Sequence, residues 1–243
     1  MDKRRKKQAQ PVYQLVRPSQ LPAHMRTYLS AEWQQRWWTA VGSLLPLQPK
    51  KLALFSSVSC PGDLLIKSYD LAQLLRRFGV AVVSGFQSPV EKACLDLLLC
   101  GMQPIIIVPA KSLKNFRVPP AQRRSLSLNR LLYLSPFSLE ETRTSVRACL
   151  RRNQMVAALA EEILFVHASP GGKSQRLFDE LIRQERKVHV VQSDFNRHLV
   201  ECGAQPIEIG ELANWLSSSG LALSLPPTLP APVTPTDRQF SLF

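Results

Sequence analysis

Several features that define common protein classes are missing from this sequence of 243 residues. Its five cysteines form no Cys-x-x-Cys pair and its four histidines show no metal-ligand spacing, so we expect no metal site. The odd number of cysteines favours reduced thiols in a cytoplasmic protein. No stretch reaches the roughly 18 apolar residues of a membrane helix, and the basic start is not followed by the apolar run of a signal peptide.

Catalytic signatures are missing as well. The spacing supports no Ser-His-Asp or Cys-His order, and the loop after the first predicted strand lacks the dinucleotide fingerprint Gly-x-Gly-x-x-Gly. Gly172-Lys173-Ser174 resembles the end of a phosphate loop, but His167 stands where that motif has its first glycine. His167 ends a predicted strand, where a structural role is more common than a catalytic one. We therefore favour a binding protein that needs no cofactor over an enzyme.

Acidic residues are few, because 18 Asp and Glu stand against 31 Lys and Arg, which gives a formal net charge of +13. Such an excess favours polyanionic partners, chiefly nucleic acid, with an anionic membrane surface as the weaker alternative. Part of the excess lies in residues 1–10, which we expect to form a disordered basic arm. A solvated tail and an arm that contacts phosphates both stay open for this segment. Its basic residues are Lys3, Arg4, Arg5, Lys6 and Lys7.

What is present is an alternation of strand and helix signals between residues 51 and 209. Most strand candidates are continuous apolar runs, as expected for parallel strands covered on both faces. Capping boxes at Ser88–Glu91 and Ser138–Glu141, and an apolar stripe over 64–78, mark helices. We predict an α/β fold with a Rossmann-like, doubly wound, mostly parallel sheet that binds ligands at the carboxyl ends of its strands. The predicted strands are Lys51–Phe55, Val80–Ser84, Pro104–Val108, Leu131–Leu134, Glu162–His167 and Lys187–Val191.

The same pattern divides the chain into segments. Residues 11–48 are predicted to form a helical extension, whose Trp33, Trp37 and Trp38 either pack on the main domain or stack on nucleic-acid bases. Their helical spacing favours packing. Residues 49–220 form the Rossmann-like domain, and residues 221–243 form a flexible proline-rich tail of about 3 Å per residue.

Four segments near predicted strand ends supply candidate ligand groups. The hydroxyl-rich segment after the first strand and the glycine turn after the second suit a phosphate, although a helix cap and a plain turn explain them equally well. Arginines near residue 150 either present guanidinium groups to phosphate or form a solvated helix face. The Gly-Lys-Ser helix start offers N–H groups to an anion. The candidates are Ser56, Ser57, Ser84, Gly85, Arg151, Arg152, Asn153, Gly171, Gly172, Lys173 and Ser174.

The chain ends in a short motif with its own candidate partner. The pattern Gln-x-Ser-Leu-Phe resembles the peptide by which bacterial polymerases and repair factors bind the replication sliding clamp. In this interpretation Leu242 and Phe243 fill an apolar pocket of the clamp, and Gln239 hydrogen-bonds at its rim. The alternative is an apolar tail that pads the protein's own surface. The motif consists of Gln239, Phe240, Ser241, Leu242 and Phe243.

The order of these motifs resembles the DNA-processing protein A (DprA/Smf) family over about residues 51–192. The resemblance rests on Val82–Gly85, on residues 151–160, which echo the family's Arg-Arg-Asn-Arg-Ile-Ile-x-Gly-Leu-Ser, and on the Gly-Lys-Ser helix start. It implies an extended Rossmann-like fold that binds single-stranded DNA at the carboxyl edge of the sheet and loads the recombinase RecA. It also implies a role in bacterial DNA recombination and repair that needs no catalytic residues.

The sequence departs from that family's pattern at two places. Ser56-Ser57-Val58 stands where the family has Gly-Ser/Thr-Arg, so an arginine is absent. Of the family's Ser-Gly-x-Ala-x-Gly-Ile-Asp loop, the sequence keeps Ser84-Gly85, followed by Phe86-Gln87-Ser88-Pro89. Basic residues elsewhere are candidates to replace the missing charge, namely Lys111, Lys114, Arg117, Arg123 and Arg124.

The alternative is a nucleotide-binding or nucleotide-hydrolysing protein of a related group, the lysine-decarboxylase-like hydrolases that activate cytokinins. That group's Arg-Lys-x-x-Met resembles Arg151–Met155, and its Pro-Gly-Gly-x-Gly-Thr-x-x-Glu begins well at Pro170–Gly172. However, Ser174, Gln175 and Phe178 stand at its Gly, Thr and Glu positions. Without that carboxylate, we do not expect nucleotide hydrolysis through this motif.

Overall fold

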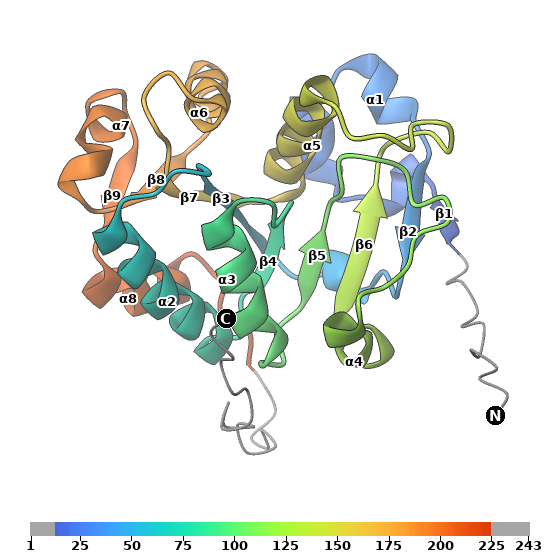
Figure 1. The fold of residues 1–243 in the computed structure, drawn as a ribbon, viewed down its shortest axis with the longest axis horizontal. Helices are drawn as coiled ribbons and strands as arrows, with labels where there is room; N and C mark the ends of the chain where they lie inside the picture. The colour runs from blue at the N-terminus through green and yellow to red at the C-terminus, as the bar shows by residue number, and fades with distance from the viewer. Residues whose placement is uncertain (1–12, 225–243) are drawn as a thin grey trace, which may run out of the picture.

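The structure, a computed structural model, describes residues 13–224. One sheet runs through its centre, with helices on both faces (Figure 1). In spatial order its strands are β1-β2-β6-β5-β4-β3-β7-β8-β9. The strands from β6 to β9 in this order are parallel, whereas β1 and β2 pair antiparallel at one edge. Their bounds are β1 Gln14–Val16, β2 Trp38–Val41, β3 Lys51–Ser56, β4 Ala81–Ser84, β5 Ile105–Ile107, β6 Leu131–Ser135, β7 Glu162–His167, β8 Val188–Val191 and β9 Gln205–Ile207.

The predicted Rossmann-like α/β fold is confirmed, and all six predicted strands are present as β3 to β8. Strands β1, β2 and β9 were not predicted. The strands β1 and β9 lie at the two edges of the sheet and are mostly exposed, and β2 has the mixed sequence Trp-Thr-Ala-Val, so none of the three shows the continuous apolar run that identified the inner strands. Their pairing to neighbouring strands stabilises them, and that pairing is a tertiary property.

Eight α-helices and several 3₁₀-helices connect these strands within the described residues. The 3₁₀-helices are Pro18–Gln20, Ala23–Tyr28, Leu45–Leu47, Pro120–Gln122, Asp194–Asn196 and Ile209–Glu211. The α-helices are α1 Ala31–Gln35, α2 Gly62–Arg77, α3 Pro89–Leu99, α4 Arg123–Ser127, α5 Val146–Leu159, α6 Lys173–Arg183, α7 Arg197–Glu201 and α8 Leu212–Ser218. No helix in this part of the chain is long and apolar enough to span a membrane.

Two large apolar clusters form most of the core, one on each face of the sheet, and a small third cluster lies around Phe137. On one face, helices α2, α3 and α8 bury residues such as Leu71, Leu98 and Leu216. On the other face, α5 and α6 pack through residues such as Val156 and Phe178. The strands between the two layers are therefore buried on both sides, which explains their continuous apolar sequences.

The segment before β3 is less helical than predicted. It contains α1, three short 3₁₀-helices and the strands β1 and β2, which extend the sheet beyond β6. Trp38 is fully buried in β2, and Trp33 packs into the cluster beside α5. Packing is thus the role of these two tryptophans, whereas Trp37 between them is half exposed.

One of the two predicted capping boxes is confirmed and the other is wrong. Ser88 Oγ accepts a hydrogen bond from Glu91 N (3.2 Å), and Glu91 Oε2 accepts one from Ser88 N (3.4 Å), at the start of α3. At the second position, Glu141 Oε1 does accept from Ser138 N (3.0 Å), but only a turn follows. Helix α5 begins later, at Val146, because Ser145 Oγ caps it by accepting from Ala148 N (3.1 Å).

The chain order of the parallel strands reverses at β3. From β3 the chain builds the sheet outward through β4, β5 and β6, and it then returns to place β7 on the other side of β3. In doubly wound sheets, ligands bind outside the carboxyl ends of the strands at such a reversal. The loops after β3, β4 and β7 all lie at this edge, which is the upper edge in Figure 1.

Candidate functional site at the carboxyl edge of the sheet

The central feature of this edge is the contact between Arg152 and Gly85. Arg152 lies in the second turn of α5, which crosses the ends of β3 and β4, and its side chain is buried, at 5% exposure. A Cβ atom added to Gly85 would lie 1.5 Å from Arg152 Nη1. Any other residue at position 85 would therefore displace the guanidinium group. The sequence-predicted Ser84, Gly85 and Arg152 are thus brought together.

The electrostatics of this contact leave Arg152 underpaired. Within the described part of the chain, Arg152 Nε and Nη1 are buried and have no hydrogen-bond partner. Burial lowers the pKa of the guanidinium, while the charge of Glu91 raises it. Both nitrogens are enclosed by protein, so the guanidinium acts on an anion outside it through its weakly compensated positive charge.

Glu91 is the residue that the sequence analysis missed as part of this site. Its carboxylate accepts hydrogen bonds from Ser56 N (3.0 Å) and Gln87 N (2.8 Å), so it ties the end of β3 to the loop after β4. The protein's own carboxylate thereby occupies backbone amides that suit a phosphate. Glu91 is the eighth residue counted from Ser84, and the family pattern Ser-Gly-x-Ala-x-Gly-Ile-Asp has its acidic residue at the same place. That match was the signal in the sequence that could have identified Glu91.

The serine hydroxyl groups at this edge stabilise the loops. Ser84 Oγ accepts from Phe86 N (3.1 Å) and supports a tight turn, in which Phe86 has a φ of 49°. Ser57 Oγ accepts from Ser169 N (2.9 Å), and Ser57 N donates to the carbonyl of His167 (2.9 Å). These bonds join the loops after β3 and β7.

The Gly-Lys-Ser segment forms the turn between β7 and α6. Gly171 has a φ of 70°, its N–H donates to Gln175 Oε1 (2.8 Å), and Gly172 N donates to the carbonyl of Ser169 (2.9 Å). Two N–H groups of the predicted anion cradle are therefore already paired within the protein. Lys173 is exposed at the first position of α6, and Ser174 is half-buried behind it.

Arg151 and Asn153 do not join Arg152. The guanidinium of Arg151 lies 5.2 Å from the centre of the Trp33 ring and therefore faces the N-terminal segment. Asn153 is half-buried on α5. Lys173 differs from Arg152 in its exposure, since it lies on the surface at the first position of α6. The edge thus has a buried centre at Arg152 and separate exposed cations around it.

His167 and Phe178 both have structural roles near this edge. His167 has the predicted structural role, because its Nδ1 pairs with Asn196 Oδ1 (2.8 Å), and burial lowers its pKa. Phe178, which stands at the catalytic Glu position of the alternative hydrolase motif, is fully buried against Phe165. It packs where that hydrolase group has its carboxylate.

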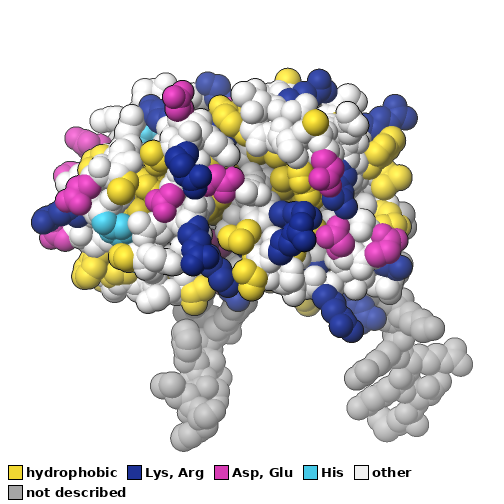
Figure 2. Space-filling model, turned by 90° about the horizontal axis from the view of Figure 1, so that it is seen from above, with side chains coloured by type: hydrophobic (Ala, Val, Ile, Leu, Met, Phe, Trp, Pro, Cys, Tyr) yellow, Lys and Arg dark blue, Asp and Glu magenta, His cyan; other side chains and the backbone are white. Residues whose placement is uncertain are grey.

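Exposed cations surround this centre. They lie in the loop after β5, near the start of α5 and at the start of α6, and Figure 2 shows Lys and Arg side chains across the middle and right of this face. The residues are Lys111, Arg143, Arg147, Lys173 and Arg176. Arg123 and Arg124, considered above as replacement charges, lie instead on α4, just before β6 begins, at the opposite edge of the sheet (Figure 1).

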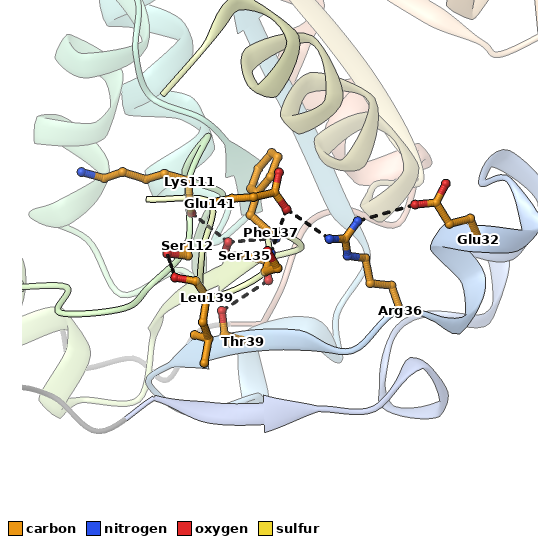
Figure 3. A network of polar contacts seen from close by, with 10 residues as sticks. Glu32, Arg36, Thr39, Lys111, Ser112, Ser135, Phe137, Leu139 and Glu141 are labelled. Atoms are coloured by element: carbon orange, nitrogen blue, oxygen red, sulfur yellow. Dashed lines mark hydrogen bonds and ion pairs between the residues drawn. The ribbon is translucent and has the colours of Figure 1, made fainter. Parts of the chain in front are cut away.

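A polar network holds the loops of this edge in place (Figure 3). Ser135 Oγ donates to the carbonyl of Lys111 (2.9 Å), and Ser112 N donates to the carbonyl of Glu141 (2.8 Å). The Glu141 carboxylate also accepts from Arg36 Nη2 at 3.1 Å. The network therefore joins the loops after β5 and β6 to each other and to the segment between α1 and β2.

Comparisons with known proteins agree with this architecture. The family model described as DNA recombination-mediator protein A matches residues 37–222. DNA processing protein A from Helicobacter pylori, whose structure was described for its single-stranded DNA binding mode, aligns with a TM-score of 0.69 and 21% identity over 85% of this chain and 96% of that one. The same protein from Streptococcus pneumoniae aligns with a TM-score of 0.65 and 18% identity over 80% and 71% of the two chains. No curated protein matches the sequence.

Proposed function

Because the chain belongs to the DNA recombination-mediator protein A family, we propose that it binds single-stranded DNA at the carboxyl edge of the sheet in bacterial DNA recombination and repair. The observation that carries this proposal is the buried Arg152, which packs on Gly85 and keeps unpaired N–H groups among exposed Lys and Arg side chains. A structural neighbour, the Helicobacter pylori protein, is described as binding single-stranded DNA. The net charge of +13 favours the same ligand.

The internal carboxylate determines how the DNA would lie. The amides of Ser56 and Gln87 already donate to Glu91, whose negative charge would repel a phosphate placed beside them. A phosphate would therefore stay on the outer side of Arg152, between this residue and the exposed cations. We expect the strand to run across the carboxyl edge, with its phosphates contacting cations such as Arg147 and Lys173.

The direct test measures how binding depends on charge at this edge. Affinity for a labelled single strand should fall steeply as salt rises, with a slope of about −0.7 for each phosphate contact. Arg152→Ala and the surface double variant Arg147→Ala/Lys173→Ala should both weaken binding, and the double variant should also flatten the salt slope. Arg77→Ala removes one exposed charge at the far end of α2 and serves as the matched control.

The surface double variant keeps this test decisive if Arg152→Ala unfolds the protein. Thermal unfolding of each variant would separate lost binding from lost structure. Equal affinity of wild-type protein and both carboxyl-edge variants would overturn the proposed site. Failure of the wild-type chain to bind a single strand at low salt would overturn the proposed function.

For the tail, we propose that Gln239–Phe243 binds the bacterial sliding clamp and raises the local concentration of the protein at replication sites. These residues lie outside the described residues, so the support is the sequence motif. A pull-down with purified clamp should retain the full chain and lose a Leu242→Ala/Phe243→Ala variant. RecA, which the family resemblance implies as a partner, can be tested in parallel by its loading onto DNA bound by the protein.

A further inference from the structure

Trp37 is the exception among the tryptophans of the N-terminal segment. Trp33 and Trp38 are 7% and 0% exposed, whereas Trp37, which lies between α1 and β2, is 51% exposed. An aromatic side chain of this size on the surface contributes little to the core. It is available for contact with another molecule.

The pairing of β1, β2 and β6 places Trp37 at the carboxyl edge of the sheet. Thr39 of β2 pairs with Ser135, the last residue of β6, and Val16, the last residue of β1, pairs with Trp38. Trp37, which directly precedes the antiparallel strand β2, and Arg17, which follows the last residue of β1, therefore lie in line with the loops after β6, β5 and β4. Three strand spacings of about 4.8 Å separate β2 from β4, so Trp37 lies roughly 14 Å along the edge from Gly85.

The surroundings of Trp37 are cationic and polar. The guanidinium carbon of Arg17 lies 5.7 Å from the centre of the Trp37 ring. The ring borders a surface depression of about 540 Å³, which Arg26, Gln34 and Gln35 also line, together with Pro18 and Ser19. No Asp or Glu is among the described residues that line it. This composition suits a planar base beside a phosphate.

The depression is held in a fixed shape from two sides. Gln34 Nε2 donates to the carbonyls of Arg26 and Leu29, both at 2.8 Å. Arg36 pairs with Glu32 (3.7 Å) and with Glu141 (3.1 Å), so the residue next to Trp37 is tied to the loop after β6 (Figure 3). A rigid aromatic platform loses little conformational entropy when it binds a ligand.

We propose that Trp37, Arg17 and Arg26 form a second contact site for the single strand, in which a base stacks on Trp37 and the two arginines hold the adjacent phosphates. This inference rests on the proposed function and extends its site along the carboxyl edge. At about 3.4 Å per stacked nucleotide, roughly four nucleotides would connect Trp37 with the Arg152 centre. The charge of the lining favours a nucleic acid over an apolar protein segment as the occupant.

The test is a fluorescence titration with a thymidine strand of about 12 nucleotides, well above the roughly four that span the two contacts. Stacking should quench tryptophan emission, and Trp37→Ala should remove most of that quenching. The same variant should weaken affinity by roughly 5- to 150-fold, as expected for the loss of one stacked base. Trp37→Phe should retain more affinity than Trp37→Ala, and Arg17→Ala should flatten the salt slope. Trp215→Phe, a change at the half-buried tryptophan of α8, is the control.

The outcomes separate this inference from the proposed function. If the wild-type chain binds and Arg152→Ala weakens binding, but Trp37→Ala has no effect on affinity or quenching, the second contact is overturned and the first stands. If the wild-type chain does not bind the strand, both are overturned. Light scattering compares the oligomeric state of the wild-type chain with that of Trp37→Ala. A change of oligomeric state would show that the surface around Trp37 is a contact between copies of the chain, which would overturn the inference.

Discussion

The guanidinium of Arg152 lies directly on the backbone of Gly85, in the space that a Cβ atom at position 85 would occupy. This contact joins helix α5, which precedes β7, to the turn that ends β4, and it fixes the one buried cation of the site at the carboxyl edge among the described residues.

Gly85→Ala should destabilise the protein and weaken binding of single-stranded DNA. The methyl group would lie 1.5 Å from Arg152 Nη1, and overpacking of a buried position costs about 1–3 kcal/mol. Urea unfolding measures the loss, and Gly62→Ala, where a Cβ meets nothing within 4 Å, is the control. Adding Arg152→Ala to Gly85→Ala should recover part of the stability, and a double variant less stable than both single variants would contradict the proposed contact.

Glu91→Gln should lower the free energy of unfolding by about 1–3 kcal/mol. The carboxylate accepts from Ser56 N and from Gln87 N, so an amide would turn its NH₂ group toward one of these donors. Removal of the negative charge should also raise the affinity for single-stranded DNA at low salt, because Arg152 then faces no internal anion. Glu140→Gln, at an exposed position, is the control, and unchanged stability of the Glu91 variant would refute this role.

Glu162 should make stability depend on acid pH. The hydrogen bond to His189 Nε2 (3.0 Å) is the main cause that holds the pKa of Glu162 below its usual 4.5. A carboxylate with a lowered pKa contributes stability that is complete above pH 4.5 and is lost as the pH falls through the folded-state value. The free energy of unfolding, measured at a series of pH values from neutral to acid, should therefore decrease less for Glu162→Gln than for wild type. An equal decrease in both proteins would contradict the prediction.

Lys51→Met should cost about 1–3 kcal/mol, because it leaves two backbone carbonyls without their buried donor and removes an ion pair with the half-buried Glu161. Lys51 Nζ is buried and donates to the carbonyls of Leu47 (3.1 Å) and Pro49 (2.7 Å), and it lies 3.5 Å from Glu161 Oε1. Lys50→Met, at the exposed neighbouring residue, should have a much smaller effect. Thermal unfolding measures both, and similar melting temperatures for the two variants would show that the buried network contributes little.

The sequence predicted the inner strands of the sheet and the helices that cover them better than it predicted the strands at the two edges. The strands β3 to β8 are mostly apolar and buried on both faces, so the apolar runs that contain them identify them in the sequence. The strands β1 and β9 are mostly exposed and β2 contains a threonine, so they show no such run and depend on hydrogen bonds to a neighbouring strand. For the same reason, the extension before β3 was predicted as helical, although it also completes the sheet.

The candidate site shows the same division. The sequence identified Gly85 and Arg152 as candidates, because a glycine after a predicted strand and an arginine within an apolar helix both interrupt the hydrophobic pattern. It placed Arg151 beside Arg152 as an equal candidate, yet their side chains point to different partners, since successive helical positions are about 100° apart. The hydrophobic pattern could not assign Glu91 to the site, because its capping role at the start of α3 already explained it.

Taken alone, the amino-acid sequence determined the class of fold, the positive charge and the alternation of buried strands and covering helices. These follow from local periodicity and composition, which do not depend on contacts between distant residues. Only the tertiary structure decided that Ser57 joins the loops after β3 and β7, that Glu91 occupies the backbone amides and that Trp37 stays exposed at the same edge. Each of these depends on which strand ends lie side by side, and strand order is set by long-range packing rather than by any local pattern.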